Sequence, residues 1–327
     1  MVPVCPRSGG SAHQPRRRPS RCRSGGFGVG PERAVRSGFV TLVGRPNAGK
    51  STLLNCLVGS KISITSAKPQ TTRLRVMGVR HLPDAQVVFV DTPGIAKPVT
   101  SLGEQLNETA RTAVAELEPL DVICIVLDAT APLGRGDRLI WESLPPGMST
   151  VVAVTKCDRA SKAQVLAQLA AAAEFDADAY FPVSGLTGEG TDALLDHLAA
   201  GLGEGPAYFP PESITDLPDA WRISEAVREQ LLTRLDDELP YSIAVRVTEW
   251  EADRIRCDIA VERPSQKGIV IGRGGRMLRE VGTAARRALG LDGVYLELRV
   301  RVEPDWQRTP DAVARMLAPE APSEPLD

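Results

Sequence analysis

The sequence predicts an α/β protein with two domains: a doubly wound, mostly parallel sheet followed by a smaller α/β unit. Runs that are apolar at nearly every position alternate with segments suited to helices, as expected for strands buried on both faces of a parallel sheet. This pattern ends near Leu202, and residues 203–218 contain four prolines, which is typical of a linker. The length of 327 residues also fits two domains.

Each domain has its own expected order of elements. The apolar runs of the first domain, predicted as strands, are 39–43, 87–90, 122–127, 150–154 and 179–183. The second domain is predicted to contain a helix over 219–237, strands over 242–250 and 254–262, helices over 265–271 and 276–289, and a strand over 294–302. The predicted boundaries are 38–203 for the first domain, 204–218 for the linker, 219–308 for the second domain and 309–327 for a flexible tail.

Residues 1–37 are predicted to be a disordered, arginine-rich extension, with eight arginines against one acid, Glu32. An organelle transit peptide, an arm that tethers RNA and a start without function all remain open. Since the whole chain has a net charge of −2, the residues after 37 carry −9. Any nucleic-acid contact outside the extension must therefore come from a local basic patch.

Composition excludes several classes of protein. The six cysteines are widely spaced and form no CxxC pair, so neither a disulfide framework nor a zinc site is expected. The longest apolar stretches, such as 122–127, are far shorter than the roughly 18 residues of a membrane span. We expect a cytoplasmic protein, and a monomer because no long exposed apolar stripe is evident.

The strongest motif follows the first expected strand. Residues 44–51 read GRPNAGKS, a full match to G-x-x-x-x-G-K-[ST] between a strand and a helix. The glycines let backbone N–H groups surround phosphates, the Lys50 ammonium reaches the β- and γ-phosphates, and the Ser51 hydroxyl ligates Mg²⁺. The predicted nucleotide-binding residues here are Gly44, Arg45, Pro46, Asn47, Ala48, Gly49, Lys50, Ser51 and Thr52.

A second segment expected to sense phosphate, DTPG at 91–94, directly follows the strand predicted at 87–90. Asp91 is expected to hold Mg²⁺ through its water shell, and the Gly94 N–H to sense the γ-phosphate. The predicted nucleotide-binding residues here are Asp91, Thr92, Pro93 and Gly94. Because Ile95 stands where many signalling GTPases place a water-orienting glutamine, slow hydrolysis is expected.

Two further side chains are expected to hold cations. Thr72, favoured over Thr71, would complete the Mg²⁺ shell only when the γ-phosphate is present, which would make its loop a switch. Asn47 is a candidate K⁺ ligand, with simple shaping of the loop as the alternative. The predicted catalytic residues are therefore Lys50, Thr72, Gly94 and Asn47, and the predicted cofactors are Mg²⁺ and K⁺.

A guanine-reading motif follows the strand predicted at 150–154. Residues 155–158 read TKCD, in which the Asp158 carboxylate can accept from N1–H and from the exocyclic amine of guanine. The motif therefore selects GTP over ATP. Thr155 replaces the commoner asparagine, and Gly185, which follows the next strand, replaces the commoner alanine. The predicted residues are Thr155, Lys156, Asp158, Ser184, Gly185 and Leu186.

A basic turn in the second domain points to RNA. Residues 271–275 read IGRGG, which fits the V/I-I-G-x-x-G signature of KH domains, where a glycine turn between two helices approaches a nucleic-acid backbone. Residues 263–287 contain seven cations against one acid, Glu280, a footprint of phosphate binding. The bland alternative is a solvated basic helix. The predicted RNA-binding residues are Lys267, Ile271, Gly272, Arg273, Gly274, Gly275, Arg276 and Arg279.

Together these motifs resemble the Era family of bacterial GTPases, of the TrmE-Era-EngA type and actinobacterial in composition. The resemblance covers about residues 37–308 and is carried by GRPNAGKS (44–51), KISITSAKPQTTR (61–73), VDTPG (90–94), ELPY (238–241) and ERPSQKGIVIGRGG (262–275). It implies a phosphate-loop, Ras-like GTPase domain followed by a type II KH domain.

The resemblance also implies a function: a GTP-hydrolysing switch whose KH domain binds the 3′ end of 16S rRNA and which assists assembly of the 30S subunit. The implied partners are GTP, GDP, 16S rRNA and the 30S subunit, with peripheral association with the inner membrane and no DNA. Two alternatives stay open. One is a constitutive RNA-binding protein whose nucleotide domain is only structural, and the other is a related GTPase of tRNA modification or large-subunit assembly.

Overall fold

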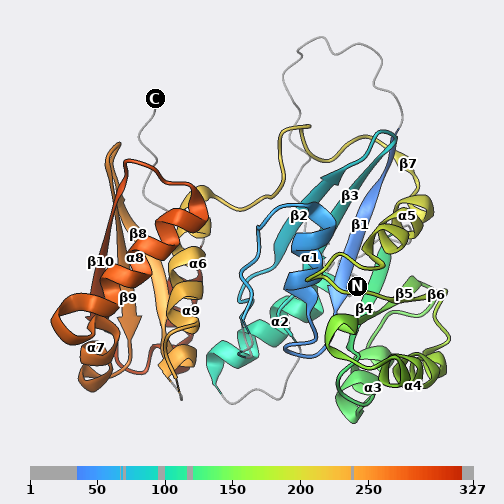
Figure 1. Ribbon diagram of the computed structural model, residues 1–327, viewed down its shortest axis with the longest axis horizontal. Coiled ribbons are helices and arrows are strands. Elements are labelled where there is room, and N and C mark those ends of the chain that lie inside the picture. The colour runs from blue at the N-terminus through green and yellow to red at the C-terminus, as the bar shows by residue number, and fades with distance from the viewer. Residues whose placement is uncertain are drawn as a thin grey trace, which may run out of the picture. The chain divides into compact units, whose positions relative to one another are not determined.

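The structure, a computed structural model, describes residues 35–66, 68, 71–94, 100–115, 121–236 and 239–318. Two sheets carry these parts of the chain (Figure 1). The first is built from β1 (Val35–Val43), β2 (Val76–His81), β3 (Ala85–Asp91), β4 (Val122–Asp128), β5 (Ser149–Thr155), β6 (Ala179–Pro182) and β7 (Glu204–Gly205). Its order is β2-β3-β1-β4-β5-β6, with β7 beside β1. The five predicted strands are present and parallel, whereas β2 and β7 are antiparallel additions that the sequence analysis did not predict.

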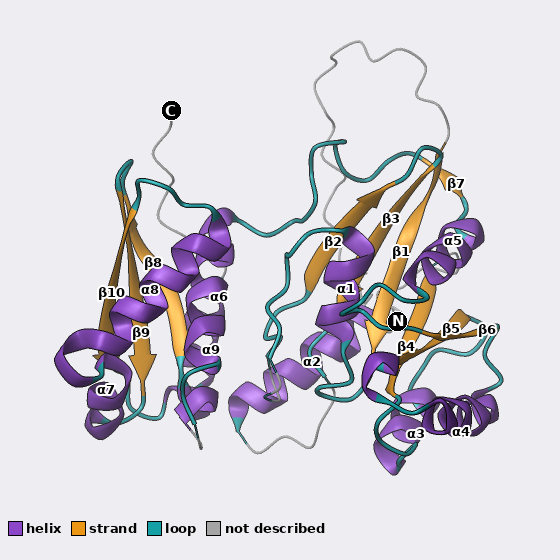
Figure 2. Cartoon of the chain, viewed as in Figure 1, coloured by secondary structure: helices purple, strands orange, loops and turns teal. Residues whose placement is uncertain are grey.

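Helices cover both faces of the first sheet (Figure 2), because successive residues of a strand face opposite sides. In β4, Cys124 and Val126 share one apolar core with α1 and α5, while Ile123 and Ile125 share another with α3. The helices are α1 (Lys50–Val58), α2 (Ser101–Ala115), α3 (Arg135–Glu142), α4 (Lys162–Ala172) and α5 (Thr191–Gly201), with the 3-10 helices η1 (Cys157–Arg159) and η2 (Ala173–Phe175). The predicted doubly wound fold is therefore confirmed.

The second sheet has the order β10-β9-β8 and packs against helices. Its strands are β8 (Ala244–Trp250), β9 (Arg254–Val261) and β10 (Tyr295–Val302), and its helices are α6 (Asp219–Leu232), α7 (Pro264–Ile271), α8 (Arg276–Leu289) and α9 (Pro310–Leu317), with η3 (Leu239–Ser242), η4 (Arg273–Gly275) and η5 (Trp306–Arg308). Val227 of α6 and Val281 of α8 are buried against Val245 and Ile259 of the sheet. This is the smaller α/β unit that the sequence predicts.

The first strand begins earlier than predicted. Residues 35–37 were assigned to the disordered extension, but they belong to β1, where Ser37 pairs with Gln86 of β3 and Arg36 pairs with Glu204 of β7. The prediction failed because Arg36 and Ser37 interrupt the apolar pattern. In addition, β7 lies inside the segment predicted as linker. Residues 1–34 of the predicted extension lie outside the described residues.

The predicted tail contains a helix. Residues 309–327 were predicted to be flexible because of their prolines, but α9 occupies Pro310–Leu317, and Val313 and Met316 are buried beside Trp306. Pro310 stands in the first turn of α9, where a missing N–H costs nothing. Another difference is that α6 ends at Leu232 rather than at 237.

The described residues of both domains fall within one compact unit. Every helix in the described ranges is too short or too polar to cross a membrane.

Candidate nucleotide site and RNA-binding turn

The phosphate loop, residues 44–51, runs from the end of β1 into α1. Lys50 is 6% exposed, and its ammonium donates to the backbone carbonyls of Gly44, at 3.1 Å, and Arg45, at 3.0 Å. Burial lowers the pKa of Lys50 to about 8, while the nearby Asp91 carboxylate acts in the opposite direction. The two carbonyls use two of the three ammonium protons, so the third can be donated to a phosphate oxygen.

Three hydroxyl groups converge on the carboxylate of Asp91, at the end of β3. The hydroxyls of Ser51, Ser63 and Thr72 donate to Asp91 Oδ2 over 2.7, 3.1 and 3.3 Å. The Ser51 and Thr72 oxygens are also hydrogen-bonded to each other, at 2.8 Å. Ser51 begins α1, whereas Ser63 and Thr72 belong to the segment between α1 and β2, so three parts of the chain meet at one carboxylate.

This oxygen cluster fits a magnesium ion. Asp91 is fully buried, its Oδ1 has no hydrogen-bond partner among the described residues, and burial raises its pKa. Mg²⁺ takes oxygen ligands, commonly one or two carboxylates together with phosphates and water. Because no group of three or more His, Cys, Asp or Glu side chains in the described ranges could hold a metal, an ion here would depend on the hydroxyls, one carboxylate and the nucleotide.

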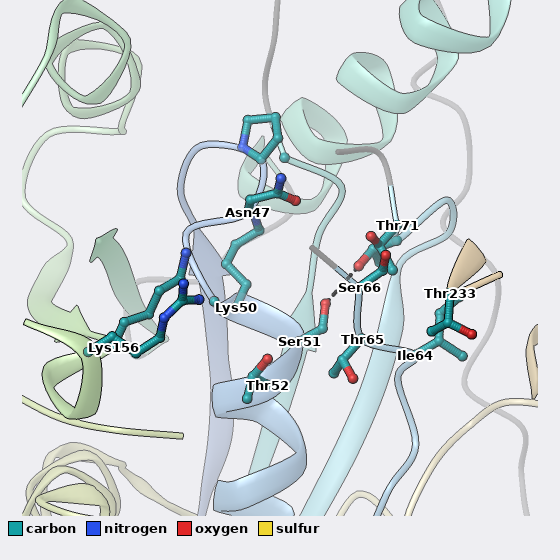
Figure 3. Close-up of a pocket in the computed structure, with 15 residues that line it drawn as sticks. Asn47, Lys50, Ser51, Thr52, Ile64, Thr65, Ser66, Thr71, Lys156 and Thr233 are labelled. Carbon is teal, nitrogen blue, oxygen red and sulfur yellow. Dashed lines mark hydrogen bonds between the residues drawn. The ribbon is translucent and has the colours of Figure 1, made fainter. Parts of the chain in front are cut away.

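A cavity of 580 Å³ lies beside the phosphate loop. Figure 3 shows Lys156 on one side of Lys50, and Thr65 and Ser66 on the other. The predicted residues that line the cavity are Pro46, Asn47, Gly49, Lys50, Ser51, Thr52, Thr72, Gly94 and Lys156, and it is also lined by Ile64, Thr65, Ser66, Thr71, Arg159 and Thr233. Ala48, Asp91 and Thr92 are buried and do not line it.

The turn at 91–94 lies against the phosphate loop. A Cβ atom on Gly94 would be 2.6 Å from the backbone nitrogen of Pro46, so a larger residue could not approach so closely. The hydroxyl of Thr92 donates to the carbonyl of Leu42 in β1, at 2.9 Å, and fixes the start of the turn. Ile95, on which the expectation of slow hydrolysis depended, lies outside the described residues.

Thr155, which stands in place of the commoner asparagine, connects the phosphate loop to the sheet. It is 2% exposed, and its hydroxyl lies 2.5 Å from the carbonyl oxygen of Ala48 and 3.0 Å from that of Leu127. A threonine hydroxyl can therefore perform the bridging role that an asparagine side chain would have.

Asp128, at the end of β4, and Ser184, in the turn after β6, orient the two charged members of the guanine motif. The Lys156 ammonium donates to Oδ2 of Asp128, at the end of β4, over 2.6 Å. The Ser184 hydroxyl donates to Oδ1 of Asp158, also over 2.6 Å. Lys156 lines the cavity, whereas Asp158 does not.

Steric packing explains why Gly185 replaces the commoner alanine after β6. A Cβ atom on Gly185 would be 2.9 Å from the backbone of Leu53 in α1, so this turn packs more tightly on α1 than an alanine allows. The next residue, Leu186, is 75% exposed, and its N–H donates to the Ser184 hydroxyl. Ser184, Gly185 and Leu186 therefore form one turn beside Asp158.

Asn47 has a left-handed backbone, with φ of 63°, and lines the cavity. Asparagine tolerates this conformation better than most residues. Its position agrees with both alternatives of the sequence analysis, a cation ligand and a residue that shapes the loop.

The basic turn of the second domain has the predicted form. It joins α7 to α8 through Gly272, Gly274 and Gly275, which all have positive φ. A Cβ atom on Gly272 would also be 2.7 Å from that of Met277. The predicted cations Lys267, Arg273, Arg276 and Arg279 are exposed, and Ile271 is half-buried against the core.

Comparison with known proteins finds matches for both domains, the one with the phosphate loop and the one with the glycine turn. Residues 39–156 match a family model described as 50S ribosome-binding GTPase, and residues 238–307 match one described as KH domain. The chain is 48% identical over 296 residues to GTPase Era of Mycobacterium tuberculosis (strain ATCC 25618 / H37Rv), which covers 86% of this chain and 98% of the relative. The chain belongs to the Era family. It is accordingly a GTPase with a C-terminal KH domain, as the motifs predict.

Solved structures of Era proteins share the fold. A single-residue variant of Aquifex aeolicus Era bound to GDP·AlF4⁻ is 38% identical with a TM-score of 0.82, covering 87% of this chain and 99% of that chain. Era in complex with MgGDPNP and nucleotides 1506–1542 of 16S ribosomal RNA is 37% identical with the same TM-score and coverage. GTPase Era of Mycobacterium avium (strain 104) is 46% identical over 297 residues, covering 86% of this chain and 98% of the relative, and the mycobacterial relatives agree with the predicted actinobacterial character.

The structure brings several residues to the site of this Era-family GTPase that the sequence analysis did not assign, among them Ser63 and Thr65. Ser63 donates to Asp91, and Thr65 lines the cavity. The hydroxyl-rich segment 61–66, KISITS, was the available signal. It carries no fixed spacing to Asp91, so only the folded chain shows which hydroxyls reach the carboxylate.

Proposed function

We propose that this Era-family GTPase is a nucleotide-driven switch that binds the 3′ end of 16S rRNA through its KH domain and assists maturation of the 30S subunit. The observation that carries the proposal is the similarity along both domains to an Era protein bound to MgGDPNP and to a 16S rRNA fragment at once. A chain with the phosphate loop and the glycine turn in the same arrangement is suited to the same two ligands.

The nucleotide side of the proposal assigns a role to each motif. Lys50 binds the β- and γ-phosphates, and Asp158 reads the guanine base. Ser51 and Thr72 would hold Mg²⁺ directly, and Asp91 would hold it through water. When bound, the ion would supply positive charge at the phosphate oxygens. Thr72 would complete the Mg²⁺ shell only when the γ-phosphate is present, and the Gly94 N–H would sense the γ-phosphate. The assignment is supported by the convergence of Ser51 and Thr72 on Asp91.

Asn47 is proposed to hold K⁺ beside the phosphates. Its side chain belongs to the phosphate loop and lines the cavity, and an amide oxygen is an acceptable ligand for a hard cation. This positive charge would do the work that an arginine finger does in other GTPases.

The RNA side of the proposal uses the exposed turn between α7 and α8. Gly272, Gly274 and Gly275 would let an RNA backbone approach, as in KH domains, whose glycine turn holds about four nucleotides. The four exposed cations Lys267, Arg273, Arg276 and Arg279 neutralise its phosphates.

We also propose that the GTPase domain runs from Val35 to Gly205, since β1 and β7 both belong to its sheet, and that the KH domain begins at residue 219. The chain is proposed to act as a monomer in the cytoplasm, with peripheral association with the inner membrane, and without binding DNA.

The test is GTP hydrolysis by the full chain in K⁺ and in Na⁺ buffer, with and without an RNA oligonucleotide that matches the 3′ end of 16S rRNA. Faster hydrolysis with both K⁺ and RNA is the expected result. Hydrolysis that is indifferent to RNA would contradict the switch and would favour two independent modules on one chain. An oligonucleotide with a scrambled sequence is the control for non-specific charge.

A further inference from the structure

Two adjacent charged residues of α6, the first helix of the KH domain, contact the loop that carries Thr72. The Glu229 carboxylate accepts from the Lys61 ammonium at 2.5 Å and from the Thr65 backbone N–H at 3.0 Å. The Arg228 guanidinium donates to the backbone carbonyl of Thr71. The 61–73 loop is therefore held near both of its ends by one turn of one helix.

Both α6 side chains are almost fully buried, Arg228 at 2% and Glu229 at 4% exposure. Arg228 is further paired with Glu225 through two hydrogen bonds, of 2.7 and 2.6 Å. A buried charge is costly unless its partners satisfy it. Since the loop supplies partners to both residues, a loop that moved away would leave two buried charges with fewer hydrogen bonds.

The contact made by Arg228 is one peptide unit away from the proposed metal ligand. The Thr71 carbonyl belongs to the planar peptide bond that joins Thr71 to Thr72. The Thr72 hydroxyl is in turn hydrogen-bonded to Ser51 and to Asp91. Fixing this carbonyl therefore restricts where the Thr72 side chain can lie.

The contact made by Glu229 acts at the other end of the loop. Its Oε1 accepts from the backbone N–H of Thr65, and Thr65 lines the nucleotide cavity. The outer partner, Lys61, is 51% exposed and pairs with the same carboxylate. Two contacts from one helix thus support the part of the loop that precedes its proposed ligand, Thr72.

We infer that Arg228 and Glu229 are positioning residues for the GTPase site, through which the KH domain holds the 61–73 loop in the arrangement that reads the γ-phosphate. Neither side chain touches the nucleotide; Arg228 acts through Thr71 and Thr72, and Glu229 acts through Thr65. The inference rests on the proposed role of Thr72 and extends it by naming the residues of the other domain that set its position.

The test compares two affinities of the full-length chain, for Mg·GDPNP and for Mg·GDP, measured by displacement of a fluorescent guanine nucleotide. The GDP affinity depends on the phosphate loop and on Asp158, whereas the GDPNP affinity also depends on Thr72. R228M and E229Q are expected to weaken GDPNP binding about tenfold, within the usual range of coupling between sites, and to change GDP binding less than about twofold. The quantity compared is the GDPNP affinity divided by the GDP affinity. This ratio separates positioning from stability, because general destabilisation would not favour one nucleotide over the other.

Three further variants give the comparison its controls. R222Q is the matched control, because Arg222 lies on the same helix and pairs with Asp219, an ion pair outside the 61–73 loop; its ratio should equal that of the original chain. R228K keeps the positive charge and should recover part of the ratio and part of kcat at saturating GTP. T72A should lower the ratio at least as much as R228M.

The outcomes distinguish a failure of this inference from a failure of the proposed function. An unchanged ratio in R228M and E229Q, with T72A lowered, would overturn the inference and leave the proposed role of Thr72 intact. An unchanged ratio in T72A would instead contradict the proposed function itself. If both α6 variants fail to fold, T65P removes the backbone N–H that Glu229 accepts from. A ratio equal to that of the original chain would then overturn the role of Glu229.

Discussion

The hydroxyl of Ser184 donates to Oδ1 of Asp158 over 2.6 Å, which joins the turn after β6 to η1. The same hydroxyl accepts from the backbone N–H groups of Leu186 and Thr187, at 3.3 and 3.1 Å. This small network fixes the orientation of the Asp158 carboxylate. Because a guanine offers two donors on one edge, a fixed carboxylate can select it over adenine.

D158N should reduce GTP affinity about 100-fold, since two hydrogen bonds to a charged group are lost and together contribute about 3 kcal/mol. The new amide N–H can donate to the carbonyl that xanthine has in place of the guanine amine, so XTP should become the better ligand. Competition between GTP and XTP for a fluorescent nucleotide measures both. D196N, on the exposed side of α5, is the control, and a D158N chain that still prefers GTP would contradict the assignment.

N47G tests the proposed K⁺ ligand without straining the backbone. Glycine adopts the positive φ of this position freely, so the substitution removes the amide oxygen and keeps the shape of the loop. Hydrolysis by N47G should be equally fast in K⁺ and in Na⁺, while GDP affinity, which also depends on Lys50 and Asp158, should stay within about twofold. Persistent stimulation by K⁺ would assign Asn47 to shaping the loop only.

R273A should weaken binding of the 16S rRNA oligonucleotide and reduce the slope of log affinity against log salt concentration by about 1, as loss of one phosphate contact does. Arg273 is exposed in the turn between α7 and α8. The matched control is R315A, which removes another exposed cation, on α9. The turn would lose its proposed role if both variants showed the same salt slope as the original chain.

M316A should destabilise the protein by about 2–5 kcal/mol, because the side chain is buried and its removal leaves a cavity. R315A, one residue away but exposed, should change stability by less than about 0.5 kcal/mol. Urea unfolding of the two variants measures the difference. Equal stabilities would mean that α9 does not pack beside Trp306 in solution.

Local patterns made much of the fold predictable. The phosphate loop, the glycine turn at 272–275 and the five parallel strands were predicted because each is defined by residues close together in the chain. β2 and residues 35–37 were missed because their strand character comes from pairing with β3 rather than from continuous apolar sequence.

Long-range contacts account for the parts of the site that the sequence did not predict. Glu229 reaches Thr65 across 164 positions and Arg228 reaches Thr71 across 157. No spacing rule connects residues so far apart, and charged residues on a helix usually face solvent. Only the folded chain shows that these two are buried against the loop.

The most direct test of the proposed switch is the affinity of the full chain for the 16S rRNA oligonucleotide in two states, loaded with Mg·GDPNP and with Mg·GDP. Coupling between two binding sites is reciprocal. If RNA strengthens the binding of GDPNP, GDPNP must therefore strengthen the binding of RNA by the same factor. We predict binding at least about fivefold tighter in the GDPNP state. Equal affinities in the two states would contradict the switch, whatever the rate of GTP hydrolysis.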